Sequence, residues 1–204
     1  MLELSTHIVY KLQRTGVLVL GCSAGGFELL THILQALPPT LPYGVLAVIH
    51  RNARYETHLE KKLADKCAIG IKAAADKEPI ESATAYFAPA GYHLLVEPNR
   101  SLSLDVSEPV HFCRPSIDVT MQSAADVYGP ATAAILLSGA NKDGAMGMMS
   151  IHRAGGLCIA QDPRYAEIDT MPAAAVALGG VHLILRNDEL IIFSKQLSNY
   201  TFRN

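Results

Sequence analysis

The sequence lacks tryptophan and is poor in charged residues, which make up 18% of its 204 residues. Its 17 Lys and Arg and 19 Asp and Glu give a formal net charge of −2, and the basic residues are scattered along the chain. Binding to nucleic acid or to an anionic membrane needs a basic stripe or cluster. We therefore expect no nucleic-acid partner.

Long hydrophobic runs are also missing. No apolar run in the sequence reaches the roughly 18 residues that a membrane-spanning helix needs. The N-terminus lacks the basic start, apolar core and small-residue cleavage site of a signal peptide. These absences predict no membrane insertion and a cytoplasmic location.

Cysteine is scarce and dispersed: the four cysteines are Cys22, Cys67, Cys113 and Cys158. A structural zinc site draws its ligands from close pairs such as CxxC, and this chain has none. The spacing therefore predicts no metal site.

Half of the residues are hydrophobic, which is enough for a buried core. Short apolar runs alternate with helical patterns. They predict strands at 17–20, 44–49, 132–137, 157–160 and 182–185, and helices at 27–37, 55–66, 116–128, 143–154, 172–178 and 188–197. Continuous apolar runs indicate parallel strands that are covered on both faces. We expect one doubly wound α/β domain over residues 1–204, with a mostly parallel sheet and residues 1–16 as an N-terminal extension.

The middle of the chain has a different pattern. Residues 84–90 read as a strand, and residues 93–98 and 101–106 are short and partly alternating, with Asn99-Arg100 between them. This pattern predicts a small antiparallel hairpin beside the main sheet.

Reactive side chains follow three of the predicted strands, in the loops after residues 20, 49 and 137. They are Ser23, His50 and Asp143. In a parallel α/β sheet, ligands bind at the carboxyl ends of the strands. The sequence thus predicts a functional site where these loops meet.

Ser23 lies in "GCSAG", which matches G-x-S-x-G between a strand and a helix. Such a turn presents a nucleophilic serine, and the following helix offers N–H groups to an oxyanion. Two alternatives remain open from the residues alone. Ser23 could cap the helix, or the loop could cradle a phosphate, although neither G-x-G-x-x-G nor the Walker pattern is present.

His50 and Asp143 supply the other two groups that an activated serine needs. His50 ends a buried strand and could take a proton from Ser23, or it could be a boundary histidine with an incidental hydrogen bond. Asp143 could cap its own helix, a role that would keep its carboxylate ionised, as an orienter of His50 requires. The order Ser, His, Asp differs from the Ser, Asp, His order of α/β-hydrolases and indicates another fold.

At these residues the sequence resembles the catalytic domain of the chemotaxis protein-glutamate methylesterases, the CheB family. The resemblance extends from about Val17 to about Leu185. It rests on six segments in the family's order: "GCSAGG", "VIHR", "YFAPAGYHLLVE", "CRPSIDV", "LLSGANKDGAMGM" and "AQDPRYAEIDTMPAAA".

The resemblance implies a serine hydrolase that cleaves glutamyl methyl esters on chemoreceptor helices, releases methanol and often deamidates receptor glutamines. Carried over, Ser23 is the nucleophile, His50 the general base and Asp143 the orienting carboxylate, with no metal or organic cofactor. Further partners implied are a receptor methyltransferase or a separate receiver protein. Family members usually carry an N-terminal receiver domain, and about 16 residues precede the first predicted strand. We expect no receiver domain in this chain, either as a stand-alone esterase or as a fragment.

Some residues depart from the family pattern. Ala24 replaces a frequent threonine, Ala140 a methionine and Asn141 a glycine, and Lys142 adds a positive charge beside the aspartate. The backbone N–H groups of Ala24 and Ala140 remain able to serve an oxyanion. Ser116 lies in a segment that borders the family's active site, but after Pro115 it reads as a helix N-cap, and we assign it no chemistry.

Two other functions compete with the hydrolase. One is a non-catalytic adaptor on the same fold that binds receptor tails or a methyltransferase. The other is a nucleotide-binding Rossmann-like module.

Overall fold

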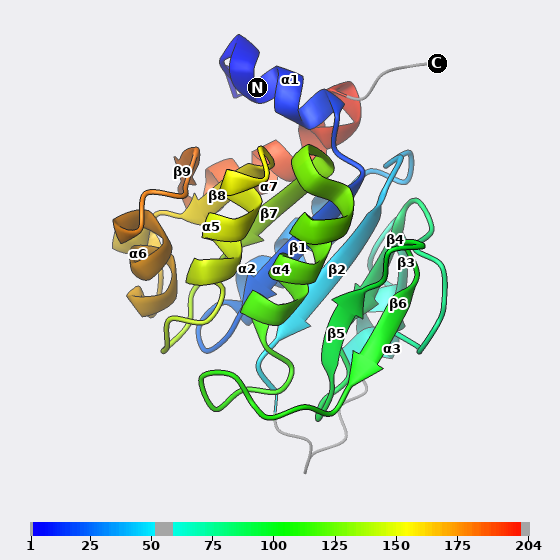
Figure 1. The fold of residues 1–204 in the computed structure, drawn as a ribbon. Helices are drawn as coiled ribbons and strands as arrows, with labels where there is room; N and C mark the ends of the chain where they lie inside the picture. Colours follow the sequence, from blue (N-terminus) through cyan, green and yellow to red (C-terminus); the bar gives the residue numbers. More distant parts are fainter. Residues whose placement is uncertain (1, 52–58, 201–204) are drawn as a thin grey trace.

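The computed structural model describes residues 2–51 and 59–200. A seven-stranded sheet forms its centre, in the order β3-β4-β2-β1-β7-β8-β9 (Figure 1), and every strand pair is parallel. Its strands are β1 (Val17–Cys22), β2 (Gly44–Ile49), β3 (Gly70–Ala73), β4 (Thr84–Phe87), β7 (Thr132–Leu136), β8 (Leu157–Gln161) and β9 (Leu183–Leu185). The predicted doubly wound α/β fold is confirmed.

One face of the sheet is covered by helices α1 (Thr6–Gln13), α2 (Phe27–Ala36) and α7 (Asn187–Gln196). In α2, Leu30, Ile33 and Leu34 are fully buried, as their helical spacing predicts. The helix ends just before Pro38-Pro39, which cannot continue it. The short helix α3 (Leu59–Ala64) contributes Leu63 to the same core.

The other face is covered by α4 (Ile117–Tyr128), α5 (Ala145–Arg153) and α6 (Thr170–Ala177), which lie in front of the sheet in Figure 1. The antiparallel hairpin of β5 (His93–Val96) and β6 (Leu102–Asp105) packs on this face too, and it confirms the predicted hairpin. Three 3-10 helices complete the described elements: η1 (Gly129–Ala131), η2 (Pro163–Tyr165) and η3 (Leu197–Tyr200).

The sequence patterns missed or misplaced a few elements. Strand β3 was not predicted because its side chains lie at the sheet edge and are mostly exposed, so it has no apolar run. Part of the expected extension at 1–16 is helix α1. Strand β1 continues past the predicted stop at Gly21, which pairs with both Val48 and Leu136. The predicted helix at 55–66 is seen only from Leu59, since residues 55–58 lie outside the described part.

The connections of the sheet change direction between two of its central strands, β1 and β7. Strand β1 leads into α2 on one face, whereas its neighbour β7 leads into α5 on the other. Loops that leave adjacent strands toward opposite faces open a ligand-binding crevice at the carboxyl ends of the strands. Within the described residues, each helix is too short or too polar to cross a bilayer.

Candidate active site

Ser23 follows β1 directly and is held by the neighbouring loop after β7. Its N–H donates to the Ser138 carbonyl oxygen at 2.9 Å. Gly25 turns the chain with a φ of +75°, and a Cβ there would lie 2.8 Å from the Ser138 Oγ, so glycine is required. The N-cap of α2 is Gly26, which makes no side-chain cap bond. The alternative that Ser23 caps this helix is therefore wrong, and its hydroxyl is free for another partner.

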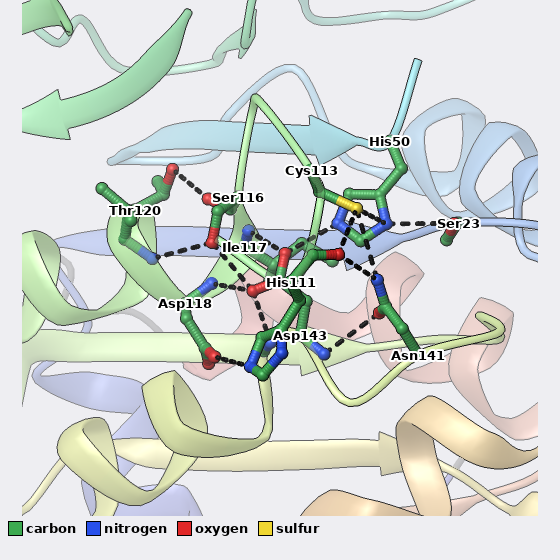
Figure 2. Close-up of polar contacts among 12 residues, drawn as sticks. Ser23, His50, His111, Cys113, Ser116, Ile117, Asp118, Thr120, Asn141 and Asp143 are labelled. Carbon is green, nitrogen blue, oxygen red and sulfur yellow. Dashed lines mark hydrogen bonds and ion pairs between the residues drawn. The ribbon is translucent and has the colours of Figure 1, made fainter. Parts of the chain in front are cut away.

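That partner is His50, at the end of β2. The His50 N–H donates to the Cys22 carbonyl oxygen at 3.3 Å, which continues the ladder between the two strands and fixes the histidine beside Ser23. The His50 Nδ1 lies 3.1 Å from the Ser23 Oγ, and its Nε2 lies 2.7 Å from the Asp143 Oδ2 (Figure 2). The structure thus brings all three predicted residues into one hydrogen-bonded line.

Asp143 is fully buried and accepts five hydrogen bonds. Besides His50, the Oδ2 accepts from the Ile117 N–H at 2.7 Å. The Oδ1 accepts from the Ser116 hydroxyl at 2.8 Å and from the N–H groups of Asp118 at 3.0 Å and Gly144 at 3.1 Å. The expectation that Asp143 caps its own helix needs a correction. The N-cap of α5 is Gly144, and the carboxylate serves the N-terminus of α4 from across the loop.

These hydrogen bonds keep the carboxyl group of Asp143 ionised. Burial raises the pKa of its carboxyl, but the hydrogen bonds from His50, the Asp118 and Ile117 N–H groups and Ser116 outweigh burial and hold the pKa below its ordinary value. An ionised carboxylate only accepts hydrogen bonds, so the proton between it and His50 belongs to Nε2. In this tautomer Nδ1 is the acceptor that faces the Ser23 hydroxyl.

Ser116 has a contact that the sequence reasoning missed. It caps α4 as predicted, with its Oγ accepting from the Val119 N–H at 3.4 Å. The same hydroxyl donates to Asp143, and the Ser116 N–H donates to the Nδ1 of the buried His93 at 3.1 Å. The signal available in the sequence was the resemblance of "RPSID" (residues 114–118) to a segment that borders the active site of the CheB family, but the contact of Ser116 with Asp143 depends on the tertiary fold.

Cys113 is a second residue that the sequence reasoning did not place at the site. Its Sγ lies 3.3 Å from the His50 Nδ1 and accepts from the Asn141 Nδ2 at 3.3 Å (Figure 2). Burial raises the pKa of the thiol, so the sulfur is protonated at neutral pH. Its single proton has two acceptors, the His50 Nδ1 and the His111 carbonyl oxygen at 3.4 Å.

A second carboxylate lies behind Asp143. Asp118 is 4% exposed, accepts from the Gly147 N–H at 2.6 Å and faces the His111 Nε2 at 3.7 Å. Burial and the negative charge of Asp143 raise the pKa of Asp118 to about 6. Below about pH 6, Asp118 therefore holds a proton and Asp143 carries the negative charge of the pair, whereas at neutral pH both carboxyls are mostly ionised.

A serine hydroxyl, an imidazole and a buried carboxylate in one line, at the carboxyl edge of a parallel sheet, form the arrangement of a serine hydrolase. The particular family follows from the sequence as a whole. The chain belongs to the CheB methylesterase family, whose model matches residues 18–192.

Relatives and a solved structure agree with this assignment. A chain of Symbiobacterium thermophilum named protein-glutamate methylesterase/protein-glutamine glutaminase is 37% identical over 86% of this chain and 48% of its own length. A chain of Leptospira interrogans (strain Fiocruz L1-130), provisionally named for the same two activities, is 39% identical over 85% of this chain and 90% of its own. The crystal structure of the Thermotoga maritima CheB methylesterase catalytic domain superposes with a TM-score of 0.82 at 28% identity, over 88% of this chain and 98% of that one.

Proposed function

We propose that this chain hydrolyses glutamyl methyl esters on methylated chemoreceptors, with Ser23 as the nucleophile. The observation that carries the proposal is the line from the Ser23 Oγ through both ring nitrogens of His50 to the buried Asp143. Membership of the CheB methylesterase family supports the substrate class. The proposal includes a methylated receptor helix as the main partner and a reaction in the cytoplasm.

In the first half-reaction, the Ser23 Oγ attacks the ester carbonyl carbon while the His50 Nδ1 takes the hydroxyl proton. The tetrahedral intermediate collapses when the same nitrogen returns the proton to the methoxy oxygen. The C–O bond then breaks, methanol leaves and the glutamyl group is esterified to Ser23. Asp143 keeps the Nε2–H side of the ring in place and stabilises the imidazolium that forms between these steps.

In the second half-reaction, His50 takes a proton from water, and the resulting hydroxide attacks the acyl-enzyme. Protonation of the Ser23 Oγ releases a free glutamate side chain and restores the resting site. The same steps convert a glutaminyl amide into glutamate with ammonia as the leaving group. This parallel accounts for the glutaminase activity in the relatives' names.

The oxyanion of the tetrahedral intermediate needs donors at the edge of the site. Within the described residues, the N–H groups of Ala24 and Ala140 donate no hydrogen bond to the protein, and both residues are exposed. Ala24 is adjacent to Ser23, and Ala140 follows Gly139, where a Cβ would lie 3.0 Å from the Ser23 Cβ. We assign the oxyanion to these two N–H groups, which do not depend on the side chains that depart from the family pattern.

The deciding experiment is methanol release from a methylated receptor by wild type and Ser23→Ala. We expect the substitution to abolish release while the circular dichroism spectrum and the melting temperature stay unchanged, because only one hydroxyl is lost. Ser82→Ala, which removes an exposed serine hydroxyl, serves as the matched control and should keep full activity. Full activity of Ser23→Ala would refute the proposed mechanism. Tight receptor binding by an inactive wild type would favour the adaptor.

A further inference from the structure

The loop between β6 and α4, residues 106–114, presents a fully exposed aromatic side chain beside the proposed active site. Phe112 has a relative exposure of 102%, and Val106 on the same loop has 64%. The other exposed large hydrophobic side chains of the described residues range from 38% to 53%. Single exposed hydrophobic residues are common on protein surfaces, so the position of Phe112 beside the site gives its exposure meaning.

The backbone holds Phe112 in this position. His111 has a φ of +49° and Phe112 a φ of +62°, a left-handed conformation that residues with a Cβ rarely adopt. Two backbone hydrogen bonds between Val110 and Cys113, at 3.1 and 2.8 Å, close the turn around them. The Arg114 Nη1 also donates to the Val106 carbonyl oxygen at 2.6 Å. Strain of this kind persists where the surroundings enforce it, and it concentrates at functional sites.

Phe112 also lines the cleft that leads to His50. The cleft has a volume of about 470 Å³, and its lining residues are His50, Arg51, Gly91, Pro109, Phe112, Cys113 and Arg114. A volume in this range holds a ligand much larger than one side chain. Phe112 and Pro109 make one part of the lining apolar, and the two arginines make another part cationic. Arg51 is also paired with Glu60 at 2.7 Å.

The exposure of Phe112 indicates how large a ligand must be to cover its ring. A small ester held at His50 would lie within the cleft and leave a ring that projects from the rim largely uncovered. A folded protein segment has a surface of its own and can extend from His50 over the rim to cover the ring. Glu60 already offsets the charge of Arg51, whereas Arg114 forms no ion pair within the described residues, so the charge of Arg114 fits a segment with acidic side chains.

We propose that Phe112 is a specificity-determining residue whose ring packs on an apolar side chain of the methylated receptor helix, next to the esterified glutamyl group. This inference rests on the proposed function and adds the residue that distinguishes a protein substrate from a small ester. The apolar contact would act in binding and leave the chemistry at Ser23 and His50 unchanged. Its loss would therefore raise KM and spare kcat.

The test compares wild type, Phe112→Ala and Phe112→Tyr on two substrates, a methylated receptor and p-nitrophenyl acetate. For Phe112→Ala we expect the KM for the receptor to rise about tenfold, as for an interface anchor, with kcat within about twofold of wild type. Hydrolysis of p-nitrophenyl acetate should not change, and Phe112→Tyr should restore the KM. Tyr10→Ala is the matched control, because Tyr10 is an exposed aromatic (53%) on α1.

Each contrary outcome has a separate meaning. A wild-type KM in Phe112→Ala, with the receptor cleaved normally, would overturn the inference and leave the proposed function standing. Equal losses on both substrates would assign Phe112 to the chemistry and overturn a role in specificity. A changed sedimentation coefficient with an unchanged KM would show that Phe112 joins two copies of this chain, which also overturns it. Hydrolysis of p-nitrophenyl acetate without any receptor cleavage by wild type would refute the proposed function, and the inference with it.

Discussion

The two nitrogens of His50 face very different surroundings. On the Nε2 side, Asp143 is fully buried and takes four further hydrogen bonds from α4 and the α5 N-cap. On the Nδ1 side, Ser23 and Cys113 are only partly buried, and both face the Nδ1 as their acceptor. The adjacent loop contains two residues in the left-handed conformation, His111 and Phe112. The closed side fixes the charge and the ring orientation. The open side is where a substrate must enter and where the proposed proton transfer occurs, so fewer contacts can be fixed there in advance.

Replacing the closed side should have the largest effect. Asp143→Asn would turn one of the two acceptor oxygens into an amide N–H₂ that faces either the two donors of Oδ2 or the three donors of Oδ1. It would also no longer enforce the His50 tautomer with a proton on Nε2. We expect kcat for methanol release to fall roughly 10³- to 10⁴-fold and the free energy of unfolding to fall by about 1–3 kcal/mol. Asp126→Asn, on the exposed side of α4, should change neither. A loss below tenfold would mean that the closed side does not control the imidazole.

Ser116 tests whether the support of Asp143 matters beyond helix capping. Ser116→Ala removes one donor to Asp143 and the cap of α4, so we expect unfolding to become about 1–2 kcal/mol easier and kcat to fall about tenfold. Ser5→Ala removes the N-cap of α1, where the Ser5 Oγ accepts from the Ile8 N–H, and touches nothing at the site. Ser5→Ala should lower the free energy of unfolding, measured by urea denaturation, and leave kcat unchanged. If Ser116→Ala also spares kcat, its bond to Asp143 is only structural.

The two sides of His50 also differ in how much of them could be predicted from the sequence. Ser23, His50 and Asp143 could be predicted because each follows a buried strand, and parallel strands bring such positions together. The partners that Asp143 has at the N-terminus of α4 could not be predicted, because α4 contacts the Asp143 loop only after α4 and α5 pack on one face of the sheet. Strand β3 escaped prediction for a different reason: its exposed edge position leaves no apolar period.

Asp118 adds a pH test of the closed side. Its pKa is raised to about 6 from an ordinary 3.8, so the folded state binds a proton more tightly than the unfolded chain. The stability that this proton provides is complete below about pH 4 and is lost as the pH rises through 6. Asp118→Asn has no carboxyl group to ionise, so it does not lose stability as the pH rises. The carbonyl oxygen of the asparagine side chain can still accept from the Gly147 N–H. We expect it to be more stable than wild type by about 1–2 kcal/mol at pH 7.5, with no advantage at pH 4. An equal difference in the free energy of unfolding at pH 4 and at pH 7.5 would assign the effect to packing instead of charge.

The smallest effect should come from Cys113, on the open side. Its protonated thiol is a weak donor, and the His111 carbonyl oxygen competes with the His50 Nδ1 for the proton. Cys113→Ala should therefore shift kcat/KM by no more than about threefold. Cys113→Ser should lower it further than alanine does, because a hydroxyl donates more strongly to the Nδ1 that Ser23 needs. Cys158→Ala, at a buried cysteine on β8, separates loss of a thiol from loss of this contact. A hundredfold loss in Cys113→Ala would mean that the thiol is part of the chemistry, and the open side would then be as fixed as the closed one.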